Sequence, residues 1–233
     1  VGHSALNVQN FTTATDSQNT AVGYAAGGAV TTGTFNTIIG SLAGTSLTTG
    51  TDNTLVGAVA GDALTTGTTN VAVGISALGS DTLGSLSVAI GRRALLTQNF
   101  TTATDVYNVA VGASAGQSLT TGIQNTLIGG LAGDALTDAD DNVAIGLAAL
   151  SADTLGSNSV AIGKSALAAQ NFTTATDTYN VAVGWNAGLS VTTGTQNTLM
   201  GGIAGDALTD ADRNVAVGYT ALGGDTLGND SVA

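Results

Sequence analysis

The chain has 233 residues, with 34 Gly, no Pro, no Cys and a formal net charge of −12. Its 4 basic residues are too few to neutralise a nucleic-acid backbone, and the negative charge disfavours docking on anionic lipid. No apolar run approaches the ~20 residues of a membrane helix, so this segment is not expected to insert into a membrane. All acidic residues are Asp, and Val, Ile and Thr are abundant, a composition that predicts an all-β fold.

A short word, [N/S]-x-x-[V/I/M]-G, recurs along the whole chain. It starts at residues 19, 36, 53, 70, 87, 108, 125, 142, 159, 180, 197 and 214, and again at 231. The step is 17 residues, except from 87 to 108 and from 159 to 180, where it is 21. Each longer step contains QNFTTATD, and a further copy of this phrase occupies residues 9–16. A fixed period of this kind is the signature of a repeat architecture.

A longer period defines the expected domain organisation, which is one continuous repeat domain. Residues 1–18 are a partial 21-residue coil, and 19–107 form a first cassette of four 17-residue coils and one 21-residue coil. Residues 108–179 form the second cassette, and 180–233 form a third, truncated one. The chain begins and ends in mid-pattern, which indicates a segment of a longer protein.

The positions within a unit predict one coil of a parallel β-solenoid, or β-roll. The β-branched residue at position four suits a strand that faces a packed interior, and the constant Gly at position five suits a bend with positive φ or a close backbone approach. The constant Ala at position eight indicates a crowded site. The second half of the unit reads AG…L-T-T-G or AL…DTLG, and supplies a large apolar residue such as Leu47 or Leu83. Each coil offers only about four large apolar side chains for 17 ordered residues, so the chain is expected to be an obligate oligomer.

Three stretches resemble the head repeats of YadA-like trimeric autotransporter adhesins. They are SVAIGRRAL (Ser87–Leu95), SVAIGKSAL (Ser159–Leu167) and NVAVGWNAG (Asn180–Gly188). The resemblance covers essentially the whole chain and implies a left-handed parallel β-roll, a homotrimer of chains packed side by side, and no active site. The Thr-Gly-rich repeats are also similar to those in tail-fibre proteins of phages.

Few residues suggest chemistry, and no enzymatic activity is expected. The single His, His3, has no Cys or Glu with which to build a catalytic pair, so no cofactor is expected. Carboxylates in TDADDN and TDADRN are candidate Ca²⁺ ligands, although neither segment matches a known calcium loop. These candidates are Asp138, Asp140, Asp210 and Asp212.

Two further sets of residues are candidate contact sites. Positions six and seven, after the constant Gly, collect most of the basic and aromatic side chains, which suits a contact strip or an exposed corner that tolerates any residue. The strip consists of Tyr24, Arg92, Arg93, Lys164, Trp185 and Tyr219, together with His3. In the QNFTTATD segments, Phe11, Phe100 and Phe172 are expected to anchor loops that protrude at cassette intervals.

These observations favour a structural or receptor-binding segment of a trimeric surface attachment fibre. The expected location is extracellular, on a bacterial cell surface or in a virion tail fibre, with itself and a cell-surface receptor or glycan as partners. The alternative is an extracellular β-solenoid that binds calcium or ice. Ice binding would use the Thr pairs 32/34, 49/51 and 66/68, although this array is broken at Ile123 and at the DAD and DTLG turns.

Overall fold

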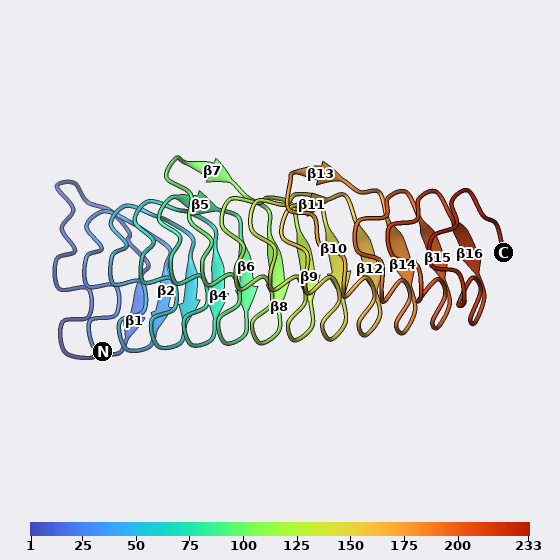
Figure 1. The fold of residues 1–233 in the computed structure, drawn as a ribbon. Coiled ribbons are helices and arrows are strands. Elements are labelled where there is room, and N and C mark those ends of the chain that lie inside the picture. The colour runs from blue at the N-terminus through green and yellow to red at the C-terminus, as the bar shows by residue number, and fades with distance from the viewer. The chain divides into compact units, whose positions relative to one another are not determined.

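The computed structural model describes all of residues 1–233 as short β-strands joined by turns, without a helix (Figure 1). No helix that could cross a membrane is therefore present. The strands are β1 (Thr20–Val22), β2 (Thr37–Ile39), β3 (Thr54–Val56), β4 (Val71–Val73), β5 (Gly84–Ser85), β6 (Val88–Ile90), β7 (Thr104–Asp105), β8 (Val109–Val111), β9 (Thr126–Ile128), β10 (Val143–Ile145), β11 (Gly156–Ser157), β12 (Val160–Ile162), β13 (Thr176–Asp177), β14 (Val181–Val183), β15 (Thr198–Met200) and β16 (Val215–Val217).

The chain divides into two compact units, unit 1 (Val1–Ser114) and unit 2 (Ala115–Ala233). In unit 1 the strand order is β1-β2-β3-β4-β6-β8, and in unit 2 it is β9-β10-β12-β14-β15-β16, with every pair parallel. Thr20 pairs with Thr37, one 17-residue step away, whereas Val88 pairs with Val109 across a 21-residue step. The predicted parallel β-solenoid with 17-residue coils is thereby confirmed.

Alternation along each strand places position three of the word inside the coil. The central strand residue is buried in every coil, as Ile38, Leu55 and Ala72 show. The β-branched residue at position four points outward instead, and Val217 is 59% exposed. The prediction that position four faces the interior was therefore wrong. Because the coil is thin, Ala at position three is large enough to fill its interior in several coils. The more hydrophobic residue at position four therefore lies on the outside.

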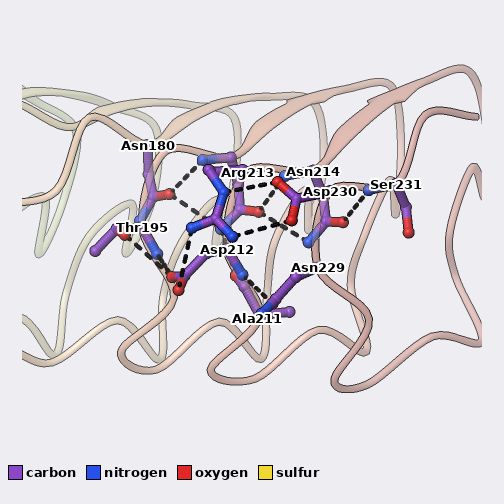
Figure 2. Close-up of polar contacts among 10 residues, drawn as sticks. Asn180, Thr195, Ala211, Asp212, Arg213, Asn214, Asn229, Asp230 and Ser231 are labelled. Atoms are coloured by element: carbon purple, nitrogen blue, oxygen red, sulfur yellow. Dashed lines mark hydrogen bonds and ion pairs between the residues drawn. The ribbon is translucent and has the colours of Figure 1, made fainter.

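A ladder of buried Asn side chains runs through each unit at position one. Asn197 Nδ2 donates to Asn180 Oδ1 over 3.2 Å and to the Ala211 carbonyl over 2.8 Å. Asn197 Oδ1 in turn accepts the backbone N–H and the Nδ2 of Asn214. Figure 2 shows this ladder continuing from Asn214 to Ser231. Each side chain thus satisfies backbone groups in its own coil and in the next one, where water is excluded.

The constant Gly at position five makes the close approach that the sequence indicates. Gly146 has φ +136, a region that L-residues rarely adopt, and a Cβ there would collide with the carbonyl oxygen of Gly163 in the next coil. The constant Ala at position eight is fully buried, as at Ala43 and Ala60. These two positions therefore hold the coils at their short spacing.

The two forms of the unit bury their large apolar residue at different places. Coils with AG bury a residue at position twelve, such as Leu47, whereas coils with AL bury the Leu of the AL pair, such as Leu78. Leu83, which the sequence suggested for the AL form, is only half-buried, so that assignment was wrong. A Cβ on Gly44 would lie 2.8 Å from Leu55 Cδ1, which explains why coils stacked on a large inner Leu keep Gly at this place.

The four additional residues of each 21-residue coil form a bulge on the solenoid surface. In the bulges, β7 pairs in parallel with β5, and β13 pairs in parallel with β11, and both project from the coils in Figure 1. Phe100 and Phe172 are each only 7% exposed. Each Phe was expected to pack on its own chain or on a neighbouring one; Phe100 and Phe172 are buried within this chain, whereas Phe11 is half-buried.

Candidate interaction face

The outer face of the parallel sheet in each unit carries a row of apolar side chains. Positions two and four of the word point outward and carry Thr or Val followed by Val, Ile or Met. Met200 is 44% exposed, and the other residues at position four are half-buried or exposed. At about 4.8 Å per strand and 3.3 Å per residue, the six three-residue strands of one unit cover about 290 Å². Contiguous apolar patches of a few hundred Å² are close to the largest that soluble monomers expose, and such patches are often functional.

The predicted contact residues flank this face at the turn after each strand. Trp185 is 53% exposed and follows Val183, while Tyr219 is 74% exposed and follows Val217. The ring of Tyr219 covers Gly202 of the preceding coil, where a Cβ would lie 3.4 Å from the ring. Trp185 and Tyr219 thus lie at an exposed corner, and the apolar face beside it was not predicted from the sequence.

The remaining predicted contact residues lie at the same corner and are solvent-exposed. Tyr24 stacks on His3, with ring centroids 5.7 Å apart and an interplanar angle of 15°. Arg92, Arg93 and Lys164 follow β6 and β12 and are exposed. On the other margin, the residue just before the word is aromatic in three coils, at Phe35, Tyr107 and Tyr179, and these side chains are exposed as well. Apolar strand faces are thus bordered by aromatic and cationic side chains.

The acidic turns use their carboxylates as hydrogen-bond acceptors for the neighbouring coil. Asp140 Oδ1 accepts the N–H of Ile123 over 2.7 Å, and Asp138 accepts the hydroxyl of Thr121. Burial raises the pKa of Asp140, the Ile123 N–H opposes this shift, and the charges of Asp138 and Asp141 add to it. No group of three or more His, Cys or acidic side chains suitable for a metal ion occurs in residues 1–233.

The equivalent turn in the third cassette carries a cation of its own. Asp212 Oδ1 accepts both the N–H and the hydroxyl of Thr195, and Arg213 bonds Asp230 in the next coil at 2.6 Å (Figure 2). This ion pair lowers the pKa of Asp230. Asp210 accepts the hydroxyl of Thr209.

Calcium titration of the whole chain is expected to give no binding heat below millimolar Ca²⁺. The carboxylates at these turns lie in pairs and already accept hydrogen bonds, whereas a Ca²⁺ site needs six to eight oxygen ligands. Isothermal calorimetry on the chain and on Asp138→Asn/Asp140→Asn measures this directly. Micromolar binding that the double substitution abolishes would contradict the expectation.

Asp134, in the AGDAL segment of the second cassette, has an unsatisfied carboxylate. Its Oδ1 is buried without a hydrogen-bond partner. Burial raises the pKa of Asp134, and a hydrogen bond from its own backbone N–H partly opposes the shift. Asp62 occupies the same place in the first cassette, and burial raises its pKa in the same way. These carboxylates therefore weaken the fold when they are ionised.

Asp134→Asn is expected to stabilise the chain at pH 7, by a few tenths to about 1 kcal/mol after allowance for solvent screening. Because the folded-state pKa of Asp134 lies above 3.8, the ordinary value of an Asp side chain, the folded chain binds the proton more tightly than the unfolded chain. The advantage of Asn should therefore shrink as the pH falls through the folded-state pKa, and vanish below 3.8. Urea unfolding at pH 7 and pH 3.5 tests this, with Asp105→Asn on the exposed bulge as the control. An advantage that stayed constant with pH would contradict it.

The Thr array considered for ice binding lies on the turn that follows position twelve. Thr32, Thr49 and Thr66 are exposed, whereas Thr34, Thr51 and Thr68 are half-buried. In the next coil Leu83 takes the place of the exposed Thr. The array therefore extends over three coils of unit 1.

Two polar features of the core were missed by sequence reasoning. The Asn at position one was visible as a recurring residue, but its type was not interpreted. Asp81 and Asp153 of the DTLG turns, with Gln98 and Gln170 of the bulge coils, are fully buried. The sequence feature that could have revealed these residues is that QNF occurs in the coil directly after a DTLG coil, at 98–100 and again at 170–172.

Residues 1–233 contain no pocket, so the candidate surface is a sheet face with its bordering side chains. Comparison with protein-family models, with curated proteins and with solved structures found no match for the chain.

Proposed function

We propose that this chain is a non-enzymatic segment of a trimeric surface attachment fibre, in which copies of the chain pack through their apolar sheet faces. The observation that carries the proposal is the row of outward Val, Ile and Met side chains on β1–β4, β6 and β8 of unit 1, and on the corresponding strands of unit 2. A solvent-exposed row of this kind is the part of the fold that a second copy would cover.

Aromatic and cationic side chains at the margins of the face support the same role. Trp, Tyr and Arg are the residues on which interface energy concentrates, and Trp185, Tyr219 and Arg92 all stand at the edge of an apolar strand row. The number of copies, three, follows from the resemblance to YadA-like head repeats. The same resemblance supports an extracellular location on a bacterial surface or a virion fibre, and a receptor or glycan as the external partner.

Val183→Lys is expected to dissociate the assembly, because it buries a charge in the middle of the proposed interface. Thr193→Lys is the matched control. Thr193 lies in the same coil and is exposed, but it belongs to the turn after position twelve and not to β14. Sedimentation velocity should show the oligomer for the unchanged chain and for Thr193→Lys, and a smaller species for Val183→Lys. Equal masses for all three proteins would contradict the proposed interface.

The fibre role has a separate test in the protein that contains this segment. Deleting residues 108–179 removes one cassette and keeps the repeat in register, so the fibre should shorten without losing its fold. Retained attachment after the deletion indicates a spacer, and lost attachment with an intact fibre assigns recognition to this segment. A deletion that leaves the fibre length unchanged in electron micrographs would contradict the role as part of the shaft.

A further inference from the structure

The stacking of nearly identical coils poses a problem of register. Asn36 and Asn53 of two AG coils and Asn70 of the next coil make the same hydrogen bonds with their neighbours at the same distances along the chain. A coil that skipped its neighbour and stacked one coil further on would find the same partners. Register is weakly specified wherever successive pairings are equivalent.

The boundary between a DTLG coil and the following QNF coil is not equivalent to the others. Asp81 is fully buried, and its Oδ1 accepts the N–H of Gly84 at 3.0 Å and the N–H of Phe100 at 3.2 Å. Its Oδ2 accepts Gln98 Nε2 at 2.6 Å. Two of these three donors come from the next coil, so the carboxylate is satisfied only when that coil carries QNF.

The network extends from Gln98 into the Asn ladder. Gln98 Nε2 also donates to Ser87 Oγ at 3.0 Å, and Gln98 Oε1 accepts Asn108 Nδ2 at 3.0 Å. Ser87 lacks the side-chain amide that Asn carries at this position, and Gln98 supplies a donor and an acceptor in its place. The ladder therefore passes through Gln98 at this coil.

The second cassette repeats the arrangement group by group. Asp153 accepts the N–H groups of Gly156 and Phe172 and the Nε2 of Gln170, the last at 2.6 Å. Gln170 again bonds Ser159 and accepts Asn180 Nδ2. Asp153, Gln170 and Ser159 are all fully buried.

We propose that the DTLG turn and the QNF segment of the next coil form a register lock, which determines which coil stacks on which. A slipped coil would place Leu or Val, the usual residues at position twelve, against the buried carboxylate. It would also leave the Gln amide against an apolar side chain. Both errors bury unsatisfied polar groups, one of them charged, which is far more costly than a mismatch between apolar residues. Buried polar groups that fix register are the best-attested use of such groups in other folds. One lock per cassette would suffice to phase the unlocked AG coils between them.

A polarity exchange tests the network. In Asp81→Asn the new amide faces Gln98 Nε2, and in Gln98→Glu a second carboxylate faces Asp81. Each single change should raise amide exchange at Gly84 and Phe100 about 10- to 100-fold. The double variant Asp81→Asn/Gln98→Glu restores a donor opposite an acceptor, so exchange should return to within about threefold of the unchanged chain. Double-variant exchange as fast as that of the worse single variant would overturn the network.

Engineered disulfides test the register itself, because the chain has no Cys of its own. Ser80→Cys/Thr97→Cys joins adjacent coils beside Asp81 and Gln98, whereas Ala63→Cys/Thr97→Cys joins coils that become adjacent only after a slip. Adjacent coils at about 4.8 Å are within disulfide reach. The slip disulfide should be absent from the otherwise unchanged chain.

Leu78→Gly/Asp81→Leu gives the DTLG coil the composition of an AG coil and removes the lock. In that background the slip disulfide should rise at least tenfold, as measured by peptide mass spectrometry. The matched control is Leu222→Gly/Asp225→Leu, because the DTLG turn at Asp225 has no QNF coil stacked on it within residues 1–233, and it should leave the slip disulfide at baseline. A folded lock variant without the slip disulfide would overturn the proposal. If the lock variant fails to fold, the double variant Asp81→Asn/Gln98→Glu provides the test. Failure of that variant to restore slow amide exchange would also overturn the proposal.

Discussion

Asn197→Ala is expected to destabilise unit 2 by roughly 3–5 kcal/mol, far more than the loss of an amide side chain usually costs. Asn197 is fully buried and its side chain bonds Asn180, the Ala211 carbonyl and the backbone and side chain of Asn214. Alanine removes the partner of the Ala211 carbonyl and of the backbone N–H and Nδ2 of Asn214 in a place that water does not reach, while Asn180 Oδ1 keeps the backbone N–H of residue 197. Urea unfolding gives the loss, and the backbone amide of Asn214 should lose its protection against hydrogen exchange.

The neighbouring residue provides the control for this prediction. Gln196 has an amide of the same chemistry, but it is exposed. Gln196→Ala should therefore change stability by less than about 0.5 kcal/mol. Similar losses for the two variants would show that the Asn ladder does not stabilise the coil stack.

Gly146→Ala is expected to cost about 3 kcal/mol or more, because it combines an unfavourable φ with a collision. Gly146 has φ +136, and its Cβ would strike the backbone carbonyl of Gly163, which cannot move without separating the coils. Thermal unfolding monitored by circular dichroism should show a clearly lower midpoint.

Two other glycines separate the contributions to this loss. Gly218 has the same φ, +136, but nothing lies within 4 Å of its Cβ position, so Gly218→Ala should cost about 1–2 kcal/mol. Gly224 has neither the unusual φ nor a close neighbour, and Gly224→Ala should be nearly neutral. A loss at Gly146 no larger than that at Gly218 would mean that inter-coil contact at this Gly does not set the spacing.

The period of the repeat was sufficient to predict the solenoid, because a 17-residue step with constant Gly and Ala leaves few other ways to stack the units. The bulges were also predictable from the period. The strands of a 21-residue coil pair in the same way as those of a 17-residue coil, so the four additional residues must leave the coil. Phe100 and Phe172 are buried in the coils that carry these bulges.

The phase of the strand was not predictable from hydrophobicity. Positions three and four are both apolar, and only the cross-section of the coil decides that Ala89 lies inside and Ile90 outside. Hydrophobicity also does not show which of Leu78 and Leu83 is the inner residue, because both are Leu in one short segment. Leu78 has a positive φ of 51°, and this backbone conformation directs its side chain inward.

The candidate site was located only in part for a related reason. Exposed Trp185 and Tyr219 stood out as unusual residues in the sequence, but the apolar face beside them depends on the strand phase. The Asp81–Gln98 pair depends on three-dimensional stacking as well, since 17 residues separate two side chains that meet only when the coils are in register.

The mass of the unmodified chain in solution tests the account most directly. Sedimentation equilibrium at micromolar concentration is predicted to give three times the chain mass of 22.5 kDa, with the parallel-sheet signal of circular dichroism intact. A stable, fully folded species of 22.5 kDa would contradict the proposal that copies of this chain cover one another's apolar faces.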